Sequence, residues 1–316
     1  MEFRYGRWLG THLSSILPNP LCKCCLPIRY KLFGLFYDAL VCTESLPAKR
    51  RIEKTITRQL MKKLLLLTVL FLCASTKTFA APYDHIHLAA TSSQEAVNWY
   101  VKHFGGEAAR FLRSTDTSYP IDRVMYGDIA VIFFERDPGE GSVGSAVDHF
   151  GFSMTNVAEV VANVVADGGR QLGELREFSG MQIGFVEDPW GTKIEIIDDP
   201  ELRGMHHLHL LSPDPAGTLD WYGENFGGER EQWKDAVPAL NYGDILLLVR
   251  QAREELAPTQ GRSFDHLGWK FADLTATEAE LKANGVAFSM DPREFRTIRI
   301  AFAEGPDGVR IELVEP

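Results

Sequence analysis

Along residues 82–316, short hydrophobic strands alternate with amphipathic helices. Residues 84–88 predict a strand, and residues 93–104 predict a helix because their apolar positions recur at helical spacing and two glycines follow. Three short strands come next, and two of them, at residues 124–126 and 129–134, flank a Gly-Asp turn. The hydrophobic pattern therefore predicts a strand, a helix and three further strands in succession.

This pattern recurs along the chain at a nearly fixed period. Trp99-Tyr100 returns as Trp221-Tyr222 after 122 positions, and Asp148-His149 returns as Asp265-His266 after 117 positions. Self-similarity at a fixed period indicates duplicated structural units. Each half is also doubled internally, because residues 157–168 predict a second helix that is again followed by short strands.

The expected fold is therefore α+β, with four βαβββ modules. Two modules form each of two tandem domains, which we place at residues 82–199 and 205–316. A short connection joins the two domains.

The N-terminal region differs from this repeated part. Residues 61–80 combine a basic start, a short apolar run and a small-residue cleavage pattern, which is typical of a secretory signal peptide. The apolar run is too short for a typical transmembrane helix. Because Met61 resembles a start position, we interpret residues 1–60 as an upstream extension from a misassigned start. The mature protein is then expected to begin near Ala81, to be secreted or periplasmic, and to leave the membrane after cleavage.

Charge and cysteine content restrict the functions of the mature region. The first 80 residues carry a net charge of +9, so the chain's total of −10 leaves −19 on the other 236 residues. Such an acidic body argues against a nucleic-acid partner, which needs clustered cations. All five cysteines precede residue 80, so the repeated part has no disulfide and no thiolate ligand or nucleophile.

Histidine and glutamate recur at matched strand positions in both halves. Glu195 follows an Asp-Pro-Trp-Gly turn and stands in an otherwise apolar strand, where a charge needs a partner such as a metal. Two imidazoles and one carboxylate are the ligands of many catalytic divalent-metal sites and leave coordination positions open. The predicted ligands are His85, His149 and Glu195 in the first half and His207, His266 and Glu312 in the second.

Two further histidines accompany these sets. His87 and His209 each stand two residues after a predicted ligand on a strand, so they point to the same face. An imidazole there can act as a general base beside a metal-bound substrate. The alternative is a group that orients a ligand or packs at the rim. His103 and His206 are expected on the surface.

The spacing of His85, Trp99-Tyr100, Asp148-His149 and residues 188–195 resembles the vicinal oxygen chelate (VOC) superfamily, which includes glyoxalase I and the extradiol dioxygenases. The resemblance implies glyoxalase-like domains with cup-shaped mixed sheets around a divalent ion (Zn, Mn, Ni or Fe(II)). It also implies a small substrate that chelates the ion through vicinal oxygens. We expect a metal-dependent lyase or isomerase of glyoxalase type, acting as a monomer or homodimer.

Departures from the family's branches bear on the reaction. Where glyoxalase I supplies a fourth ligand, a glutamate, this chain has Phe133 and Val249, and Glu135 is a weak substitute. Residues 180–184 lack the Tyr and His of extradiol dioxygenases, which makes an Fe(II)-dependent dioxygenase the second choice. A non-catalytic binding or resistance protein is the third, because metal-free members of the superfamily bind drugs.

Overall fold

The computed structural model describes residues 25–32, 35–42 and 80–316. All but the last residue of the predicted signal peptide and most of the predicted upstream extension lie outside these ranges. The chain divides into two units, Met1–Lys77 and Thr78–Pro316. In the first unit, β1 (Cys25–Leu32) and β2 (Leu35–Cys42) form an antiparallel hairpin. Within the described residues, none of the helices combines the length and the apolar character that crossing a membrane requires.

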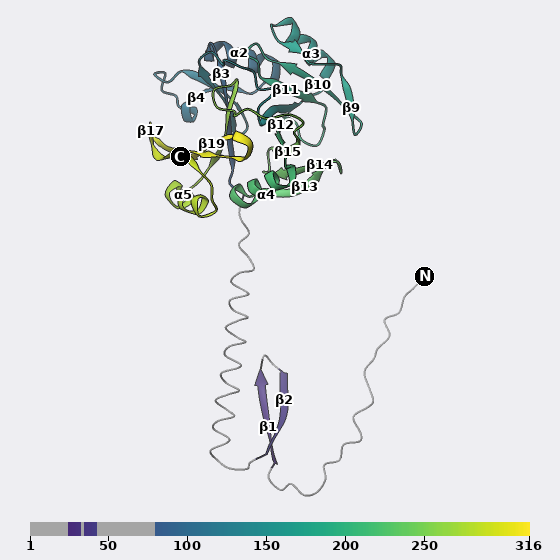
Figure 1. Ribbon diagram of the computed structural model, residues 1–316, viewed down its shortest axis with the longest axis vertical. Helices are drawn as coiled ribbons and strands as arrows, with labels where there is room; N and C mark the ends of the chain where they lie inside the picture. Colours follow the sequence, from purple (N-terminus) through teal and green to yellow (C-terminus); the bar gives the residue numbers. More distant parts are fainter. Residues whose placement is uncertain (1–24, 33–34, 43–79) are drawn as a thin grey trace, which may run out of the picture. The chain divides into compact units, whose positions relative to one another are not determined.

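The second unit repeats one strand–helix–strands module four times, as the sequence predicts (Figure 1). The first module contains β3 (Tyr83–Ala90), α2 (Ser93–Phe104), β4 (Glu107–Arg110), the 3-10 turn η1 (Phe111–Arg113), β5 (Ile121–Tyr126) and β6 (Ile129–Glu135). The second contains β7 (Val147–Ser153), α3 (Val157–Ala166), β8 (Arg170–Gln171), β9 (Arg176–Phe178), β10 (Met181–Glu187) and β11 (Lys193–Ile197). The third contains β12 (Gly204–Ser212), α4 (Pro215–Phe226), β13 (Glu229–Trp233), β14 (Val237–Asn241) and β15 (Leu246–Gln251). The fourth contains β16 (Phe264–Lys270), α5 (Leu274–Ala283), β17 (Phe288–Phe295), β18 (Ile298–Glu304), the 3-10 turn η2 (Pro306–Gly308) and β19 (Arg310–Glu315).

The modules pair across the sequence halves to form two mixed sheets. The first and fourth modules form one sheet, in the order β17-β18-β19-β16-β3-β6-β5-β4. We call it the outer sheet because its modules are the first and the last along the sequence. The second and third form the inner sheet, in the order β13-β14-β15-β12-β7-β11-β10-β8, and β9 pairs with β10. Each sheet has an antiparallel seam between the first strands of its two modules, β3 with β16 and β7 with β12. The six residues between β11 and β12 join the two modules of the inner sheet, and so short a connection closes at little entropic cost.

One large apolar core joins the two sheets. Phe104 of α2 stacks on Phe152 of β7 at 4.5 Å between ring centroids, and Phe226 of α4 lies 4.7 Å from Trp269 of β16. A helix of one sheet therefore packs against a strand of the other at both places. Figure 1 shows α2 and α3 at one end of this unit and α4 and α5 at the opposite end. Successive residues of a strand face opposite sides of the sheet. The strand histidines whose sequence neighbours pack in this core therefore lie on the face of the sheet that points away from the core.

The Asp-Pro-Trp-Gly turn is built around the buried carboxylate of Asp188. It accepts hydrogen bonds from the backbone N–H groups of Trp190 (2.9 Å) and Thr192 (2.7 Å) and from the hydroxyl of Tyr100 (2.7 Å). The fourth module has Gly305 at the matching position, 117 residues later. Within the described residues, the buried hydroxyl of Tyr222, the repeat mate of Tyr100, has no hydrogen-bond partner.

This difference predicts opposite responses to one substitution. Tyr100→Phe should lower the free energy of unfolding by about 1.5–3 kcal/mol at pH 8, the cost of losing a hydrogen bond to a charged group. Burial raises the pKa of Asp188 to about 6, so the carboxylate is ionised at that pH. Tyr222→Phe removes an unpaired hydroxyl and should leave stability unchanged or improve it. Urea denaturation of both variants is the measurement, and equal losses would contradict the assignment.

Candidate metal centres

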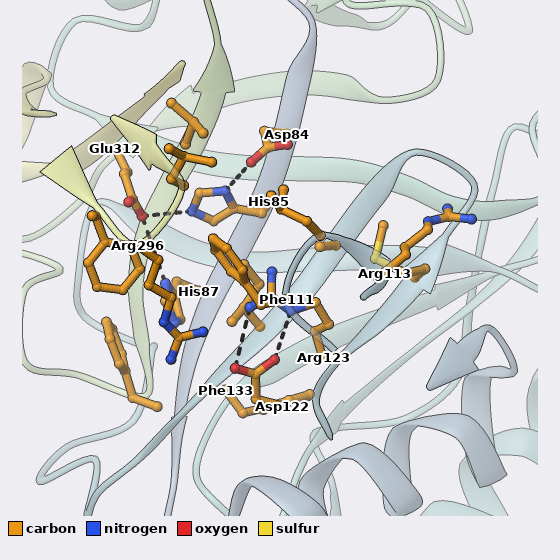
Figure 2. Close-up of a pocket in the computed structure, with 18 of the residues that line it drawn as sticks. Asp84, His85, His87, Phe111, Arg113, Asp122, Arg123, Phe133, Arg296 and Glu312 are labelled. Carbon is orange, nitrogen blue, oxygen red and sulfur yellow. Dashed lines mark hydrogen bonds and ion pairs between the residues drawn. The ribbon is translucent and has the colours of Figure 1, made fainter. Parts of the chain in front are cut away.

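Four side chains converge on the open face of the outer sheet. His85 and His87 come from β3, His266 from β16 and Glu312 from β19, and their ligand-type atoms all lie within 4.8 Å of one another. Oε2 of Glu312 is 3.1 Å from Nε2 of His85 and 2.9 Å from Nε2 of His266. Figure 2 shows His85 held between Asp84 and Glu312. We call these four residues the first cluster.

The inner sheet carries a second cluster with the same donors. It consists of His149 on β7, Glu195 on β11, and His207 and His209 on β12. Oε2 of Glu195 is 3.0 Å from Nε2 of His149 and 3.6 Å from Nε2 of His207. Within the described residues, Nε2 of His207 and both ring nitrogens of His209 are buried without a hydrogen-bond partner. Orphaned imidazole nitrogens around a carboxylate fit a divalent cation.

The structure regroups the ligands that the sequence predicts. All six are present in the clusters, but each cluster takes its residues from both halves of the repeat. His85 joins His266 and Glu312, and His207 joins His149 and Glu195. All four residues of each cluster come from one chain.

Two glycines that the sequence analysis overlooked make these clusters sterically feasible. Gly268 lies between His85 and Glu312 in the outer sheet, and Gly151 lies between His207 and Glu195 in the inner sheet. A Cβ on Gly268 would stand 2.2 Å from Cε1 of His85, and one on Gly151 would stand 2.3 Å from Cε1 of His207. The glycine two residues after each Asp-His pair therefore leaves the space in which the neighbouring imidazole lies.

Aspartates orient the imidazoles of the first cluster from behind. Nδ1 of His85 donates to Asp84 (2.7 Å), and Nδ1 of His266 donates to Asp265 (2.6 Å). Lys270 neutralises Asp84, and two arginines neutralise Asp265. A carboxylate on Nδ1 fixes the tautomer that leaves Nε2 free to bind a metal. The repeated Asp265-His266 pair was visible in the sequence, but its spacing alone did not indicate this role for the aspartate.

The second cluster has a different side chain behind one of its imidazoles, and this side chain, His206, was wrongly predicted to lie on the surface. His206 stands where the first module has Asp84, and it is fully buried with its Nδ1 2.7 Å from Nδ1 of His207. Its Nε2 faces Asp199 at 3.3 Å. His103, also expected on the surface, is 7% exposed because it pairs with Asp167 between α2 and α3. Both imidazoles are buried because an aspartate and aromatic neighbours cover them.

From the sequence, Phe133 and Val249 were compared with the fourth ligand of glyoxalase I, and the structure shows that this comparison is wrong by one residue. Phe133 faces the core, with its ring 5.0 Å from that of Tyr100, and Val249 is likewise a core residue. The residues that share the histidine face are Ile132 and Phe134 on β6 and Leu248 and Arg250 on β15. Glu135 accepts a hydrogen bond from Ser93 at 3.1 Å and belongs to neither cluster.

The two clusters open into cavities of very different size. A cavity of about 510 Å³ adjoins the first cluster, and His85, His87 and Glu312 all line it. Its other walls combine aromatic, aliphatic, acidic and cationic side chains, and Phe111, Arg113, Asp122, Arg123 and Arg296 are among them (Figure 2). The cavity beside the second cluster measures about 160 Å³. Only the first has the volume of a typical small-molecule site.

Comparisons with known proteins agree with this geometry. The family model described as "Glyoxalase/Bleomycin resistance protein/Dioxygenase superfamily" matches residues 83–196 and 204–313. The chain belongs to this superfamily. It is 30% identical over 129 residues to the lactoylglutathione lyase of Escherichia coli O157:H7, which covers 38% of this chain and 96% of that protein.

Two further proteins extend the comparison. Glyoxalase I of Saccharomyces cerevisiae is 29% identical over 150 residues, which span 37% of this chain but less than half (46%) of the yeast protein. The crystal structure of glyoxalase I from Zea mays superposes with a TM-score of 0.59 at 18% identity, over 75% of this chain and 92% of that one. The maize likeness concerns the fold, whereas the family match covers both repeats. The chain is thus a glyoxalase I-like member of the superfamily with two His/Glu clusters that could hold a divalent metal.

Gly268→Ala tests the steric basis of the first centre in this superfamily member. The added methyl group collides with the ring of His85, so the affinity of the first cluster for a divalent ion should fall, and the second cluster should keep its ion. Metal content after dialysis and titration with Co²⁺ are the measurements. The control is Gly223→Ala on α4, where a Cβ meets nothing closer than 3.6 Å. Equal metal binding in Gly268→Ala and the parent would refute the steric role.

The pH dependence of metal binding should separate the two centres. Burial lowers the pKa of His85, but hydrogen bonds and charges of Asp84 and Glu312 outweigh it and raise that pKa to about 9. A metal must then displace a proton from the first cluster below pH 9, so affinity should rise about tenfold per pH unit between pH 7 and pH 9. Burial lowers the pKa of both His207 and His209, so the second cluster should respond less there. Calorimetry in buffers of different ionisation enthalpy counts the protons, and identical release by the two sites would contradict this difference.

Proposed function

We propose that the protein is a metal-dependent lyase or isomerase of glyoxalase type, and that the first cluster with its 510 Å³ cavity is the working site. The observation that carries the proposal is that His85, His87 and Glu312 belong both to the cluster and to the cavity wall. A substrate in that cavity meets the ligand set directly. The E. coli relative's name, lactoylglutathione lyase, suggests a glutathione adduct as the first substrate to test.

In the first cluster, His85, His266 and Glu312 would hold the ion. When bound, a divalent ion there supplies Lewis acidity toward two adjacent substrate oxygens and stabilises the negative charge that develops on them. The protein keeps the ligands in place through Asp84 and Asp265. The imidazole and carboxylate atoms are nearly closed off from solvent, which strengthens their electrostatic interactions.

The part of the cavity wall around Phe111 and Arg296 suits a substrate with both apolar and anionic parts. Arg296 lies over the ring of Phe111, 4.9 Å from its centroid, and over Tyr119 at 5.1 Å. Arg123 is held by Asp122 through a 2.7 Å hydrogen bond. A guanidinium stacked on aromatic rings presents its N–H groups at the edge of the stack, where a substrate carboxylate can accept them.

The second cluster has a structural role in this proposal. Its donors are as deeply buried as those of the first, but a cavity of about 160 Å³ is too small for a typical organic substrate. An ion there would join β7, β11 and β12 at the centre of the inner sheet.

Matched glutamine substitutions test which cluster works. Glu312→Gln should lower kcat at least about 100-fold, the order of magnitude by which loss of one electrostatic stabiliser slows an enzyme. Glu195→Gln should keep turnover near that of the parent but lose one bound metal. The assay uses purified full chain with a panel of thiol–dicarbonyl adducts and catechols, before and after treatment with a chelator.

Three results would count against the proposal. Turnover that survives complete metal removal would exclude a metal-dependent reaction. Full activity of Glu312→Gln would exclude the first cluster as the site. Tight binding of a panel compound without turnover, unchanged by the chelator, would favour a sequestering protein.

A further inference from the structure

We propose that His87 is a fourth protein ligand of the first centre, through Nδ1, and that His209 has the same role in the second. The inference rests on the metal-dependent function proposed above and assigns His87 a role different from that of a general base. It rests on the placement of the two imidazoles and on what the neighbouring strands lack.

The ring of His87 points its Nδ1 into the ligand set. This atom lies 3.0 Å from Nε2 of His266 and 4.0 Å from Oε2 of Glu312. Nε2 of His266 is the free nitrogen of its ring, because Nδ1 donates to Asp265. Two ring nitrogens from facing strands and a carboxylate oxygen therefore surround one point, as ligands of a shared cation do.

The neighbouring strand offers no substitute for this ligand. β6 pairs with β3 in parallel, with His87 opposite Ile132. The side chains of β6 on this face are Ala130, Ile132 and Phe134, and those of β15 on the matching face are Leu246, Leu248 and Arg250. None of them is a common metal ligand. Among the described residues that gather at each centre, the donors left for a fourth protein ligand are His87 on β3 and His209 on β12.

The second cluster repeats the arrangement independently. The rings of His209 and His149 are 4.6 Å apart between centroids, as are those of His87 and His266. His209 is 3% exposed, and within the described residues both of its ring nitrogens lack a hydrogen-bond partner. A general base would need contact with a substrate, and the second cavity scarcely admits one. Metal ligation explains the histidine in both clusters, whereas base catalysis explains only the first.

Packing also fixes the ring of His87. Phe134 stacks on it at 3.7 Å between centroids with only 8° between the planes. A ring clamped in this way keeps Nδ1 directed at the cluster. Four protein ligands would leave two positions on a six-coordinate ion, the number that a substrate with two vicinal oxygens occupies, and none on a four-coordinate ion.

Cobalt binding distinguishes a ligand from a base without relying on activity. The full chain carrying Glu195→Gln, which disables the second cluster, is titrated with Co²⁺ and followed by visible absorption. His87→Leu in this background should lower Co²⁺ affinity at least about 100-fold, the upper end of what loss of an outer partner costs, and change the absorption spectrum. His87→Asp should recover most of the affinity, because an Asp Oδ is as many bonds from Cα as the Nδ1 of histidine.

The matched control is His103→Gln, which removes a buried histidine outside both clusters and should leave Co²⁺ binding unchanged. Thermal unfolding of the metal-free variants verifies that each is folded. The reciprocal pair, His209→Leu and His209→Asp in a Glu312→Gln background, repeats the test in the second cluster.

Each outcome decides the proposal. Parental affinity and spectrum in His87→Leu, with turnover lost, would overturn it in favour of a general base and leave the metal-dependent function intact. No recovery by Asp in either cluster would overturn ligation through Nδ1. If the parent bound no Co²⁺ at all, the proposed function would fall together with this inference.

Discussion

The antiparallel seam between the first strands of paired modules determines most of this structure. It sets His87 opposite His266 and His85 opposite Gly268 in the outer sheet, and it repeats this register between β7 and β12. The parallel pairing of β16 with β19 then brings Glu312 to the other side of Gly268. A slip of one residue would turn the cluster histidines of the slipped strand toward the core. The clusters, the cavities and the pairing of the first module with the fourth in one sheet all depend on this register.

The buried donors also explain why charge is distributed as it is around each cluster. Three imidazoles and one carboxylate would be costly to bury without a cation or protons among them. The first cluster stabilises its positive state with carboxylates on Nδ1 of His85 and His266, which Lys270, Arg136 and Arg310 in turn neutralise. In the second cluster, His206 stands in the place of one of these carboxylates. It contacts Asp199, which in turn forms an ion pair with Lys234. The two centres thus share donors but differ in the electrostatics behind them.

Sequence periodicity was sufficient for the four-module fold and for finding six of the eight residues that gather in the two clusters, but not for their grouping. The repeat predicts four equivalent modules, and equivalent modules can pair within a half or across halves with similar strand contacts. The six-residue connection between β11 and β12 and the two seams are properties of the assembled chain. The role of Gly268 depends on a residue 183 positions away, His85, which no local pattern reveals. The assignment of Phe133 failed by one residue because period-two alternation has no tolerance for an error of one.

A single length difference between the repeats accounts for the unequal cavities. The offset between matched residues is 122 from β3 to the end of α2 and falls to 116 at Tyr126 and Tyr242, so the third module lacks six residues in between. In the first module this segment holds η1 and the connection to β5, and Phe111 and Arg113 line the large cavity from it. In the third module β13 turns directly into β14, and Trp233, which matches Phe111 in the repeat, lines the small cavity. The ring of Trp233 lies 5.3 Å from that of His206 and stacks on that of Phe178 at 5.4 Å between centroids. The longer connection in the first module therefore leaves space between its side chains and the first cluster. The shorter connection in the third module places the indole of Trp233 beside the second cluster. On this argument a connection far from the ligands in sequence decides which of two equal donor sets can meet a substrate.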